Sequence, residues 1–204
     1  MNFEGLELAV SDSVYEPAED SFLLAKHAAK LSTALKGRIL EIGCGSGIVS
    51  LAAARAGKEN EVIGVDINPQ AVKCASDNAK INGITNVRFM ESNLFGAVKK
   101  TEKFDLILFN PPYLPTTNSE RVSGPLNAAF DGGRGGRKVL DEFLKEFDKH
   151  LKPNGTLLLI QSSLNNLEKT KRELAKKKFK VEILETQPFF FEKLYLLQAV
   201  HRGS

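Results

Sequence analysis

The architecture of this chain is set by residues 38–47, which read Arg38-Ile39-Leu40-Glu41-Ile42-Gly43-Cys44-Gly45-Ser46-Gly47. Residues 38–42 have the length and apolar content of a short buried strand. The glycines let the backbone turn tightly, and a helical run over 47–56 follows. Strand, glycine turn and helix form the first half of a nucleotide-binding α/β unit, in which the helix N-terminus offers free N–H groups. The G-x-G-x-G spacing is not the dinucleotide fingerprint, so this signal is weak when taken alone.

A carboxylate ends the next apolar run. Residues 61–66 predict a second strand, and Asp66 closes it 23 positions after Gly43. An acidic side chain at that place suits hydrogen bonding to the two hydroxyls of a ribose. The order and spacing of the two motifs therefore predict a nucleoside site.

The apolar run 104–109 ends in the tetrapeptide Asn110-Pro111-Pro112-Tyr113. The prolines carry no N–H, so a strand ladder must stop there, and each residue before a proline is pushed toward extended geometry. Asn110 and the Pro111 carbonyl would both accept hydrogen bonds from one NH₂ group, while Tyr113 offers a flat face to a planar group. The tetrapeptide predicts a holder for a planar amide or an exocyclic amine. A plain proline-rich turn is the alternative.

Together these motifs resemble the class I S-adenosylmethionine-dependent methyltransferases that modify planar nitrogens. Two more segments narrow the resemblance, namely Tyr15-Glu16-Pro17-Ala18-Glu19-Asp20-Ser21-Phe22-Leu23-Leu24 and Ala128-Ala129-Phe130-Asp131-Gly132-Gly133-Arg134-Gly135-Gly136-Arg137. They are similar to the HemK/PrmC-type protein glutamine methyltransferases, within them to the short branch that acts on archaeal and eukaryotic class I release factors. The similarity extends from about Val14 to the last strand.

The resemblance implies S-adenosylmethionine as the cofactor and no metal. The residues expected to contact the cofactor are Tyr15, Pro17, Asp20, Glu41, Gly43, Cys44, Gly45, Gly47, Asp66, Ile67, Asn93, Leu94 and Asn110. The acceptor is expected on Asn110, Pro111, Pro112 and Tyr113, with Asn110, Pro111 and Tyr113 as the catalytic residues.

Three of these assignments leave alternatives open. Glu41 is expected to accept N–H bonds from the glycine loop, or to meet the ammonium group of the cofactor. Asn93 stands where the family commonly has an aspartate, so either its side-chain oxygen accepts from the adenine amino group or the neighbouring backbone does this work. The motif from Tyr15 to Asp20 is expected to close over the cofactor, but it also suits a helix start.

Alternating strand-like and helical runs predict an α/β fold with a mostly parallel sheet covered by helices on both faces. The expected strands are 38–42, 61–66, 87–91, 104–109, 155–161, 180–186 and 194–201, and the expected helices are 18–32, 47–56, 69–82, 138–151 and 165–178. Asn68-Pro69 predicts a capped helix start, and Pro153-Asn154-Gly155 predicts the turn into the fifth strand. The link 188–191 is too short for a crossover helix, so the last two strands should be antiparallel.

The resemblance adds the Rossmann-like seven-stranded order 3-2-1-4-5-7-6. We expect a single domain over residues 1–204, in which residues 1–37 form an N-terminal extension and helix that contribute to the cofactor and substrate pocket.

The composition gives no sign of a nucleic-acid-binding, zinc-stabilised, secreted or membrane-spanning protein. The 204 residues are 42% hydrophobic and 26% charged, as in ordinary globular proteins, and a net charge of +3 is too small to argue for nucleic acid. Cys44 and Cys74 are the only cysteines and lack zinc-ligand spacing. A signal peptide is not evident, and no apolar run approaches the roughly 20 residues that span a bilayer, so a cytoplasmic location is expected.

Two segments have roles that the motifs leave open. Residues 114–137 are expected to help form the acceptor pocket, with Gly132, Gly133 and Gly136 allowing close folding. In that loop, Arg121, Arg134 and Arg137 would either meet a substrate backbone or be solvated. The basic run 176–178, near Lys171, Arg172 and Lys180, would attract RNA or an acidic partner, or form a solvated helix end.

Three functions compete at this point. The first is an N5-glutamine methyltransferase acting on the Gly-Gly-Gln loop of a class I translation release factor. The second is an adenine-N6 methyltransferase acting on DNA or RNA, because the same tetrapeptide would hold the adenine amino group. Such an enzyme must extrude its base and read flanking sequence, and we expect no appended recognition domain here.

The third function is that of a non-catalytic cofactor-binding subunit, against which Asp66, Asn110 and Tyr113 argue. The family resemblance also implies a partner, a small zinc-binding activator subunit that pairs with the edge strand 87–90.

Overall fold

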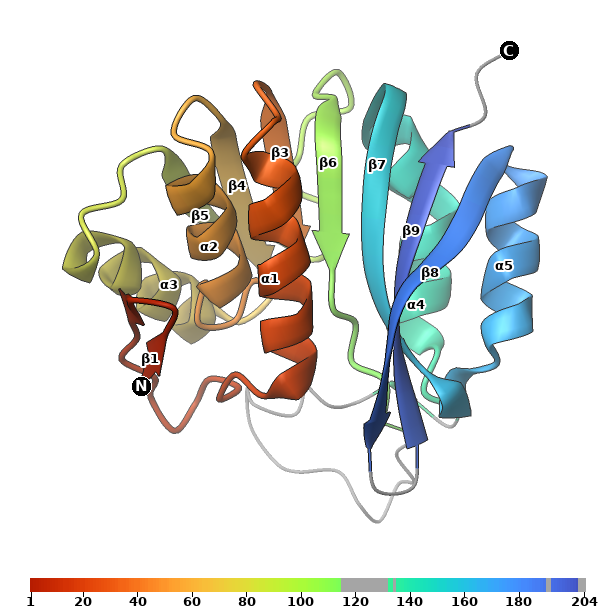
Figure 1. Cartoon of the computed structure of the whole chain (residues 1–204), viewed down its shortest axis with the longest axis horizontal. Helices are drawn as coiled ribbons and strands as arrows, with labels where there is room; N and C mark the ends of the chain where they lie inside the picture. The colour runs from red at the N-terminus through yellow and green to blue at the C-terminus, as the bar shows by residue number, and fades with distance from the viewer. Residues whose placement is uncertain (115–131, 134, 190–191, 202–204) are drawn as a thin grey trace.

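The computed structural model describes residues 1–114, 132–133, 135–189 and 192–201. Within these residues, seven strands form one sheet in the order β5-β4-β3-β6-β7-β9-β8 (Figure 1). The strands are β3 (Arg38–Ile42), β4 (Glu61–Asp66), β5 (Val87–Glu91), β6 (Phe104–Phe109), β7 (Leu151–Ser162), β8 (Phe179–Phe189) and β9 (Glu192–His201). Counted along the chain, this is the expected order 3-2-1-4-5-7-6. The first five strands are parallel, and β9 is antiparallel to both β7 and β8, as predicted.

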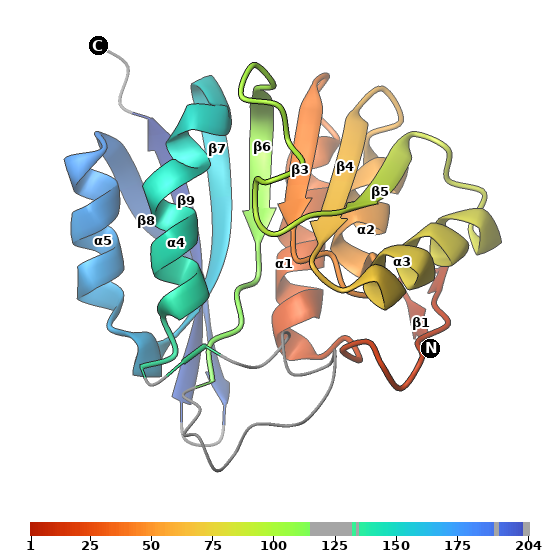
Figure 2. The same ribbon diagram turned by 180° about the vertical axis from the view of Figure 1, so that it is seen from behind.

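Helices cover both faces of the sheet. The helices are α1 (Glu19–Ser32), α2 (Ile48–Ala56), α3 (Pro69–Ile81), α4 (Lys138–Glu146) and α5 (Leu167–Lys176). Helices α1 and α2 lie on one face, and α4 and α5 lie on the other (Figures 1 and 2). Side chains alternate between the faces of a strand, so Ile39 packs with α1 and α2, while Leu40 and Ile42 pack with Phe143 of α4.

The predicted boundaries around β7 are wrong. The helix predicted over 138–151 ends at Glu146 and is followed by the 3₁₀ helix η2 (Phe147–His150). Strand β7 then starts at Leu151 rather than at 155, because Leu151 already pairs with Phe104. Regular pairing resumes only at Thr156 with Leu106, and Asn154 has a φ of 62° between the two pairs. The predicted turn at 153–155 is therefore an irregularity inside the strand.

Other predicted boundaries differ by a few residues. A 3₁₀ helix, η3 (Ser163–Asn165), precedes α5, because Asn166 caps α5 and its side chain accepts a bond from the Lys169 N–H at 3.0 Å. Strands β8 and β9 extend further toward their connection than predicted. The predicted start of α3 is confirmed, since the Asn68 side chain accepts a bond from the Gln70 N–H at 3.0 Å.

An N-terminal hairpin was not predicted from the sequence. Its strands, β1 (Asn2–Phe3) and β2 (Leu6–Glu7), are each two residues long, which is too short for a hydrophobic period to be read. The hairpin is attached to the α3 region, where Asn82 accepts from the Glu7 N–H at 2.9 Å and Asn78 accepts from the Ala9 N–H at 2.8 Å. The following residues run past the carboxyl ends of the parallel strands before α1 begins (Figure 1).

Candidate functional site

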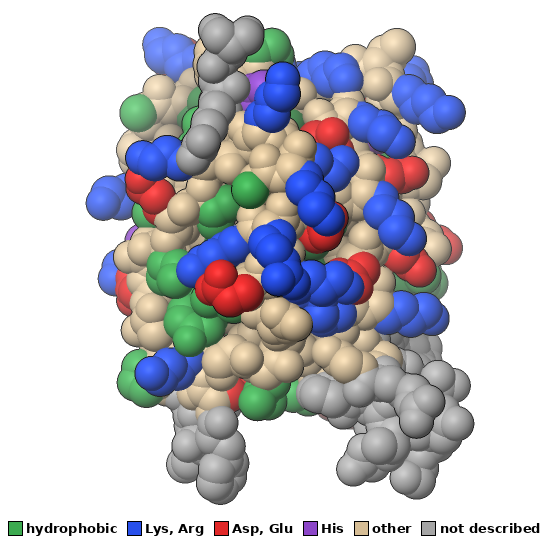
Figure 3. Space-filling view, turned by 90° about the vertical axis from the view of Figure 1, so that its right-hand side faces the viewer, with side chains coloured by type: hydrophobic (Ala, Val, Ile, Leu, Met, Phe, Trp, Pro, Cys, Tyr) green, Lys and Arg blue, Asp and Glu red, His purple; other side chains and the backbone are tan. Residues whose placement is uncertain are grey.

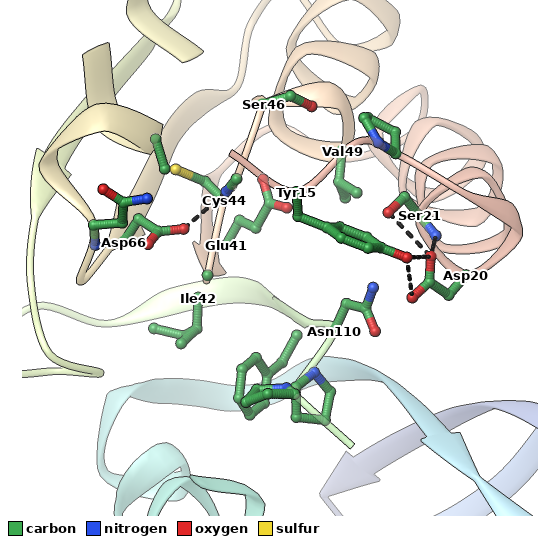
Figure 4. Close-up of a pocket in the computed structure, with 18 of the residues that line it drawn as sticks. Tyr15, Asp20, Ser21, Glu41, Ile42, Cys44, Ser46, Val49, Asp66 and Asn110 are labelled. Atoms are coloured by element: carbon green, nitrogen blue, oxygen red, sulfur yellow. Dashed lines mark hydrogen bonds between the residues drawn. The ribbon is translucent and has the colours of Figure 1, made fainter. Parts of the chain in front are cut away.

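A cavity of about 570 Å³ lies at the carboxyl ends of β3, β4 and β6. Its wall is built from the segment before α1, the glycine turn after β3, the end of β4 and the tetrapeptide after β6 (Figure 4). The predicted site residues on this wall are Tyr15, Pro17, Asp20, Glu41, Gly43, Cys44, Gly45, Asp66, Ile67, Asn93, Leu94, Asn110, Pro111, Pro112 and Tyr113. Parallel strands bring their carboxyl ends to one edge, so motifs that are distant in sequence meet there.

Gly47 has a packing role instead of a place on the cavity wall. Its φ is 85°, in the left-handed region, where it caps the start of α2. A Cβ at this position would lie 2.8 Å from the Cβ of Ala75 and 3.2 Å from the ring of Phe89. A glycine is therefore required for α3 to pack against the start of α2, and the expected cofactor contact at Gly47 does not follow from its position.

The glycine turn is held by the end of β4. The N–H groups of Gly43 and Cys44 both donate to the Val65 carbonyl, at 2.8 and 3.0 Å. Asp66 accepts from the Gly45 N–H at 2.9 Å with one carboxylate oxygen, and the other oxygen accepts from the Asn68 N–H at 2.9 Å. Burial raises the pKa of Asp66 above its ordinary value, against the opposing effect of these N–H bonds. Asp66 thus shapes the turn and also lines the cavity.

Glu41 is buried and bonded to α2. Its carboxylate accepts the Ser50 N–H at 2.8 Å and also the Ser50 hydroxyl. The N–H donor is therefore in the helix after the turn and not in the glycine loop, where it was predicted. Burial raises the pKa of Glu41 to about 8, so its charged form is costly unless a cation lies beside it.

Cys44 is an inert part of the turn. Burial raises the pKa of its thiol well above the ordinary value, and the two cysteines are free. A thiol that does not ionise near neutral pH is a poor nucleophile. The chemistry of this site therefore rests on other side chains.

Asn110 lies on the cavity wall and carries an unpaired acceptor (Figure 4). Its side-chain oxygen is buried and has no hydrogen-bond partner among the described residues. The Ser46 hydroxyl, also on the cavity wall, is buried and unpaired in the same sense. Leaving a buried polar group without a partner costs about 1–3 kcal/mol, which a ligand with a matching donor would recover.

Asp20 joins the N-terminal motif to the tetrapeptide. It is 3% exposed and accepts bonds from the hydroxyls of Tyr15 and Tyr113, each at 3.2 Å, and from the Ser21 N–H at 2.6 Å (Figure 4). Burial, together with the Asp20 charge, raises the pKa of both tyrosine hydroxyls. Both tyrosines therefore remain protonated donors over the whole neutral range.

Several residues near the tetrapeptide were missed by sequence reasoning. Glu192 and Leu194 of β9 line the cavity, and Asn165 donates its side-chain N–H to the Tyr113 carbonyl at 2.9 Å. No motif contains these residues, and β9 reaches the cavity only because it pairs with β7. Tertiary proximity was the only signal that could have identified them.

Both roles predicted for Arg137, substrate contact and solvation, are wrong. It is 8% exposed, so it is not solvated, and its guanidinium donates to Thr170 Oγ1 at 2.8 Å and pairs with Asp141 at 2.8 Å. These contacts lie within the protein and leave no free face for a substrate backbone. Arg121, Arg134 and residues 128–131 lie outside the described residues.

The described residues contain neither a cluster of metal ligands nor a helix that could span a membrane. Three or more His, Cys, Asp or Glu side chains do not gather there as ligands for a metal ion. None of the helices is both long enough and apolar enough to cross a membrane, again within the described part of the chain.

Comparison with known proteins places the chain in a family. The family model described as "Methyltransferase domain" matches residues 35–193. A protein of Methanocaldococcus jannaschii named "Putative protein N5-glutamine methyltransferase" is 46% identical over 199 residues, which are 98% of each chain. The "Release factor glutamine methyltransferase" of Fusobacterium nucleatum is 38% identical over 162 residues, covering 76% of this chain and 46% of that protein.

A solved structure supports the fold. The E. cuniculi Mtq2–Trm112 complex, described as responsible for methylation of the eRF1 translation termination factor, matches with a TM-score of 0.68. The match covers 93% of this chain and 99% of that one, at 22% identity. The family model covers most of the chain, and the Methanocaldococcus relative matches along its whole length. The chain therefore belongs to the class I S-adenosylmethionine-dependent methyltransferases of the protein N5-glutamine type.

Proposed function

We propose that this enzyme methylates the side-chain amide nitrogen of the glutamine in the Gly-Gly-Gln loop of a class I translation release factor. The observation that carries the proposal is the buried, unpaired side-chain oxygen of Asn110, which is followed by Pro111 on the same cavity wall. A primary amide has two N–H donors in one plane, and two neighbouring acceptors would hold both. The Fusobacterium relative is named for release factor glutamine methylation.

The charges on the cavity wall fit the cofactor. Five carboxylates line it, and no Lys, Arg or His is among the described lining residues; the five are Glu19, Asp20, Glu41, Asp66 and Glu192. Such a wall attracts cations. S-adenosylmethionine carries a sulfonium and an ammonium group, and when bound it supplies a methyl group on positively charged sulfur.

We assign the cofactor contacts by position. Asp66 accepts N–H bonds from Gly45, Ile67 and Asn68, and a carboxylate with about four acceptor sites would still have capacity for a ribose hydroxyl. Glu41 would pair with the ammonium group, which offsets the cost of its burial. Asn93 and Leu94 lie on the wall beside Asp66's strand end, where either the Asn93 side chain or the backbone would meet the adenine.

The acceptor residues act by orientation. An amide nitrogen is a poor nucleophile because its lone pair is delocalised into the carbonyl. Hydrogen bonds from its N–H groups to Asn110 and to the Pro111 carbonyl would favour the more pyramidal, more electron-rich nitrogen of the transition state. Alignment of two reacting groups is worth roughly 7–11 kcal/mol of a barrier. The released proton would pass to water, since no His lines the described cavity wall.

The alternative acceptor, adenine in DNA or RNA, is disfavoured by charge. A nucleic acid would bring phosphates toward a wall of carboxylates. The basic run 176–178 at the end of α5 does not compensate, because lysines on this face lie among acidic side chains (Figure 3). The ion pairs on this face are Lys171–Glu168, Lys176–Glu173, Lys177–Asp148 and Lys180–Glu182. This supports the solvated helix end over an RNA-binding surface.

The activator subunit remains part of the proposal. Strand β5 (Val87–Glu91) is the last strand on its side of the sheet, and no strand of the described residues pairs with its outer edge, which could therefore pair with a strand of a partner. The E. cuniculi protein was solved as a complex with Trm112. We propose that a small zinc-binding subunit adds to β5 here. A cytoplasmic location, where release factors act, and a single domain that includes residues 1–37 belong to the same proposal.

The test is transfer of a tritiated methyl group from S-adenosylmethionine to four acceptors. These are a class I release factor, its Gly-Gly-Gln glutamine-to-asparagine variant, duplex DNA and ribosomal RNA, each with and without the activator subunit. Label on the wild-type factor alone is the expected result. Label on nucleic acid with none on the factor would replace the proposal by adenine-N6 methylation.

A further inference from the structure

The tetrapeptide proposed to hold the acceptor begins one residue after the last pair of its strand, so none of its residues is paired in the sheet. The pairing of β6 with β3 and with β7 ends at Phe109. Pro111 and Pro112 follow and carry no N–H that a neighbouring strand could bind. The position of this segment must therefore be set by contacts of another kind.

Those contacts converge on Tyr113. Its carbonyl accepts a bond from the side-chain N–H of Asn165 at 2.9 Å, and its hydroxyl donates to Asp20 at 3.2 Å. Asn165 ends η3, between β7 and α5, whereas Asp20 is in the first turn of α1. Because α1 and α5 cover opposite faces of the sheet, Tyr113 is held from both sides (Figures 1 and 2).

Asn165 is itself rigidly placed. It is 1% exposed, and its carbonyl accepts from the Gln161 side chain at 2.9 Å and from the Arg137 guanidinium. Arg137 is fixed in turn by Asp141 and Thr170. Two acceptors of this network, Gln161 Oε1 and Asn165 Oδ1, are buried without a hydrogen-bond partner among the described residues. The donors are bonded, so any other arrangement would leave the Arg137 guanidinium or the Asn165 side-chain N–H without its acceptor.

Gly136 shows how closely these segments approach. A Cβ at Gly136 would lie 2.1 Å from the side-chain nitrogen of Asn165 and 2.3 Å from the carbonyl oxygen of Tyr113. Its φ of 64° is also a conformation that side chains disfavour. Only a glycine allows the chain after the 115–131 segment to pass beside the bond between Asn165 and Tyr113.

We propose that Asn165 and Asp20 are positioning residues, which fix Tyr113 from the two faces of the sheet and thereby hold Asn110 and Pro111 in register with the acceptor. Neither residue reacts. The effect on methyl transfer rests on the function proposed above, but the fixation of Tyr113 can be measured without any substrate.

The kinetic test compares two substitutions of one residue. Asn165→Ala removes the donor, and Asn165→Asp keeps the shape but turns an oxygen toward the Tyr113 carbonyl. We expect kcat for the release factor to fall about 10- to 100-fold in both variants, with at least as large a loss in Asn165→Asp. The KM for the factor should change less than about 3-fold, and the Kd for S-adenosylmethionine less than about 2-fold, because the cofactor wall is untouched.

The matched control is Asn60→Ala. Asn60 is also a buried asparagine, 2% exposed, and also bonds main-chain groups, with the Ser32 carbonyl at 3.0 Å and the Gly37 N–H at 2.9 Å. It precedes β4, at the opposite end of the strands from the cavity. Its loss should lower the Tm as Asn165→Ala does, while kcat stays within about 2-fold of the wild type.

A spectroscopic measurement separates positioning from general damage. The chain has three tyrosines and no tryptophan, so ring carbon signals from ¹³C-tyrosine can be assigned by single substitutions. Asn165→Ala and Asp20→Asn should shift or broaden the Tyr113 signal, and Asn60→Ala should not. An unmoved Tyr113 signal in Asn165→Ala, or a kcat equal to that of Asn60→Ala, would overturn the proposal. If the wild-type enzyme labels no release factor, the proposed function fails, while the tyrosine signals still decide whether Tyr113 is fixed.

Discussion

The two halves of the cavity are built in different ways. On the cofactor side, the bonds join residues that are 2 to 21 positions apart: Asp66 accepts the N–H groups of Gly45 and Asn68, and Glu41 accepts from Ser50. On the acceptor side, Tyr113 bonds Asp20, 93 positions away, and Asn165, 52 positions away. There, Asn110 also keeps an acceptor that no described residue satisfies.

This difference predicts whether a substitution in each half will change cofactor binding or the rate of methyl transfer. The cofactor side is built within the continuous segment 38–68, in which the carboxylates of Glu41 and Asp66 accept from groups of the same segment, so its substitutions should act on binding. On the acceptor side, the Asn110 oxygen is unpaired among the described residues and the proposed substrate amide would bond to it, so substitutions there should act on the rate. The following predictions test that separation.

The largest effect is expected from Asn110→Ala. Removing the unpaired acceptor should lower kcat by roughly 10²–10³-fold, as loss of one transition-state hydrogen bond does in other enzymes. The Kd for S-adenosylmethionine, measured by calorimetry, should change less than about 3-fold. A loss of cofactor affinity as severe as that in Asp66→Ala would show that the two halves are not separate.

Asp66→Ala should weaken cofactor binding and leave kcat nearly unchanged, which is the reverse of the effect expected for Asn110→Ala. It removes the expected ribose ligand and leaves the Gly45 and Asn68 N–H groups without their acceptor. We expect the Kd for the cofactor to rise about 30-fold, equivalent to about 2 kcal/mol, with kcat at saturation nearly unchanged. Asp77→Ala is the control, since Asp77 is on the surface of α3 and pairs only with Lys73 and Lys80 among the described residues.

The pH dependence of stability should report Glu41. Its pKa is raised to about 8 in the folded chain, so the folded state holds a proton that the unfolded state loses above its ordinary pKa of 4.5. The wild type therefore loses stability as pH rises from about 4.5 to about 8. A rise in pKa from 4.5 to about 8 corresponds to roughly 4–5 kcal/mol, so Glu41→Gln should remove this loss and be more stable than the wild type by up to that amount near pH 8 without cofactor. Denaturation curves that differ equally at pH 5 and pH 8 would contradict the assignment.

The smallest effect is expected from Tyr113→Phe. The ring remains, but its bond to Asp20 is lost, while the Asn165 bond to the main-chain carbonyl stays. We expect kcat to fall about 5-fold with an unchanged Kd for the cofactor, measured by single-turnover methyl transfer and calorimetry. Tyr195→Phe, which alters a tyrosine packed against the core away from the cavity, should leave kcat as it is.

The sequence predicted most of the fold because its signals were local. The apolar runs, the cap at Asn68 and the short link before β9 each lie within a few residues, and the structure confirms the elements that they indicate. The boundary of β7 was wrong because the start of that strand depends on pairing with β6 and not on local pattern. The hairpin β1–β2 was missed because two-residue strands carry no period.

The candidate site divides along the same line. Most of the predicted site residues line the cavity, since three of the motifs follow or end parallel strands and parallel strands end together. Asn165, Glu192 and the buried role of Arg137 were not found, because their contacts join segments that only folding brings together.

The amino-acid sequence alone predicts the seven-stranded α/β sheet, the glycine turn at the cofactor site and the tetrapeptide with an acceptor for an amide N–H. These depend on strand periods, glycine conformation and proline geometry, which neighbouring residues impose on one another. Only the tertiary structure shows three further contacts. Glu41 bonds Ser50, Asp20 accepts from the Tyr113 hydroxyl, and Asn165 holds the Tyr113 carbonyl from the other side. Hydrogen bonds between residues far apart in sequence form where the packing of helices on a sheet places them, and no local pattern encodes that placement.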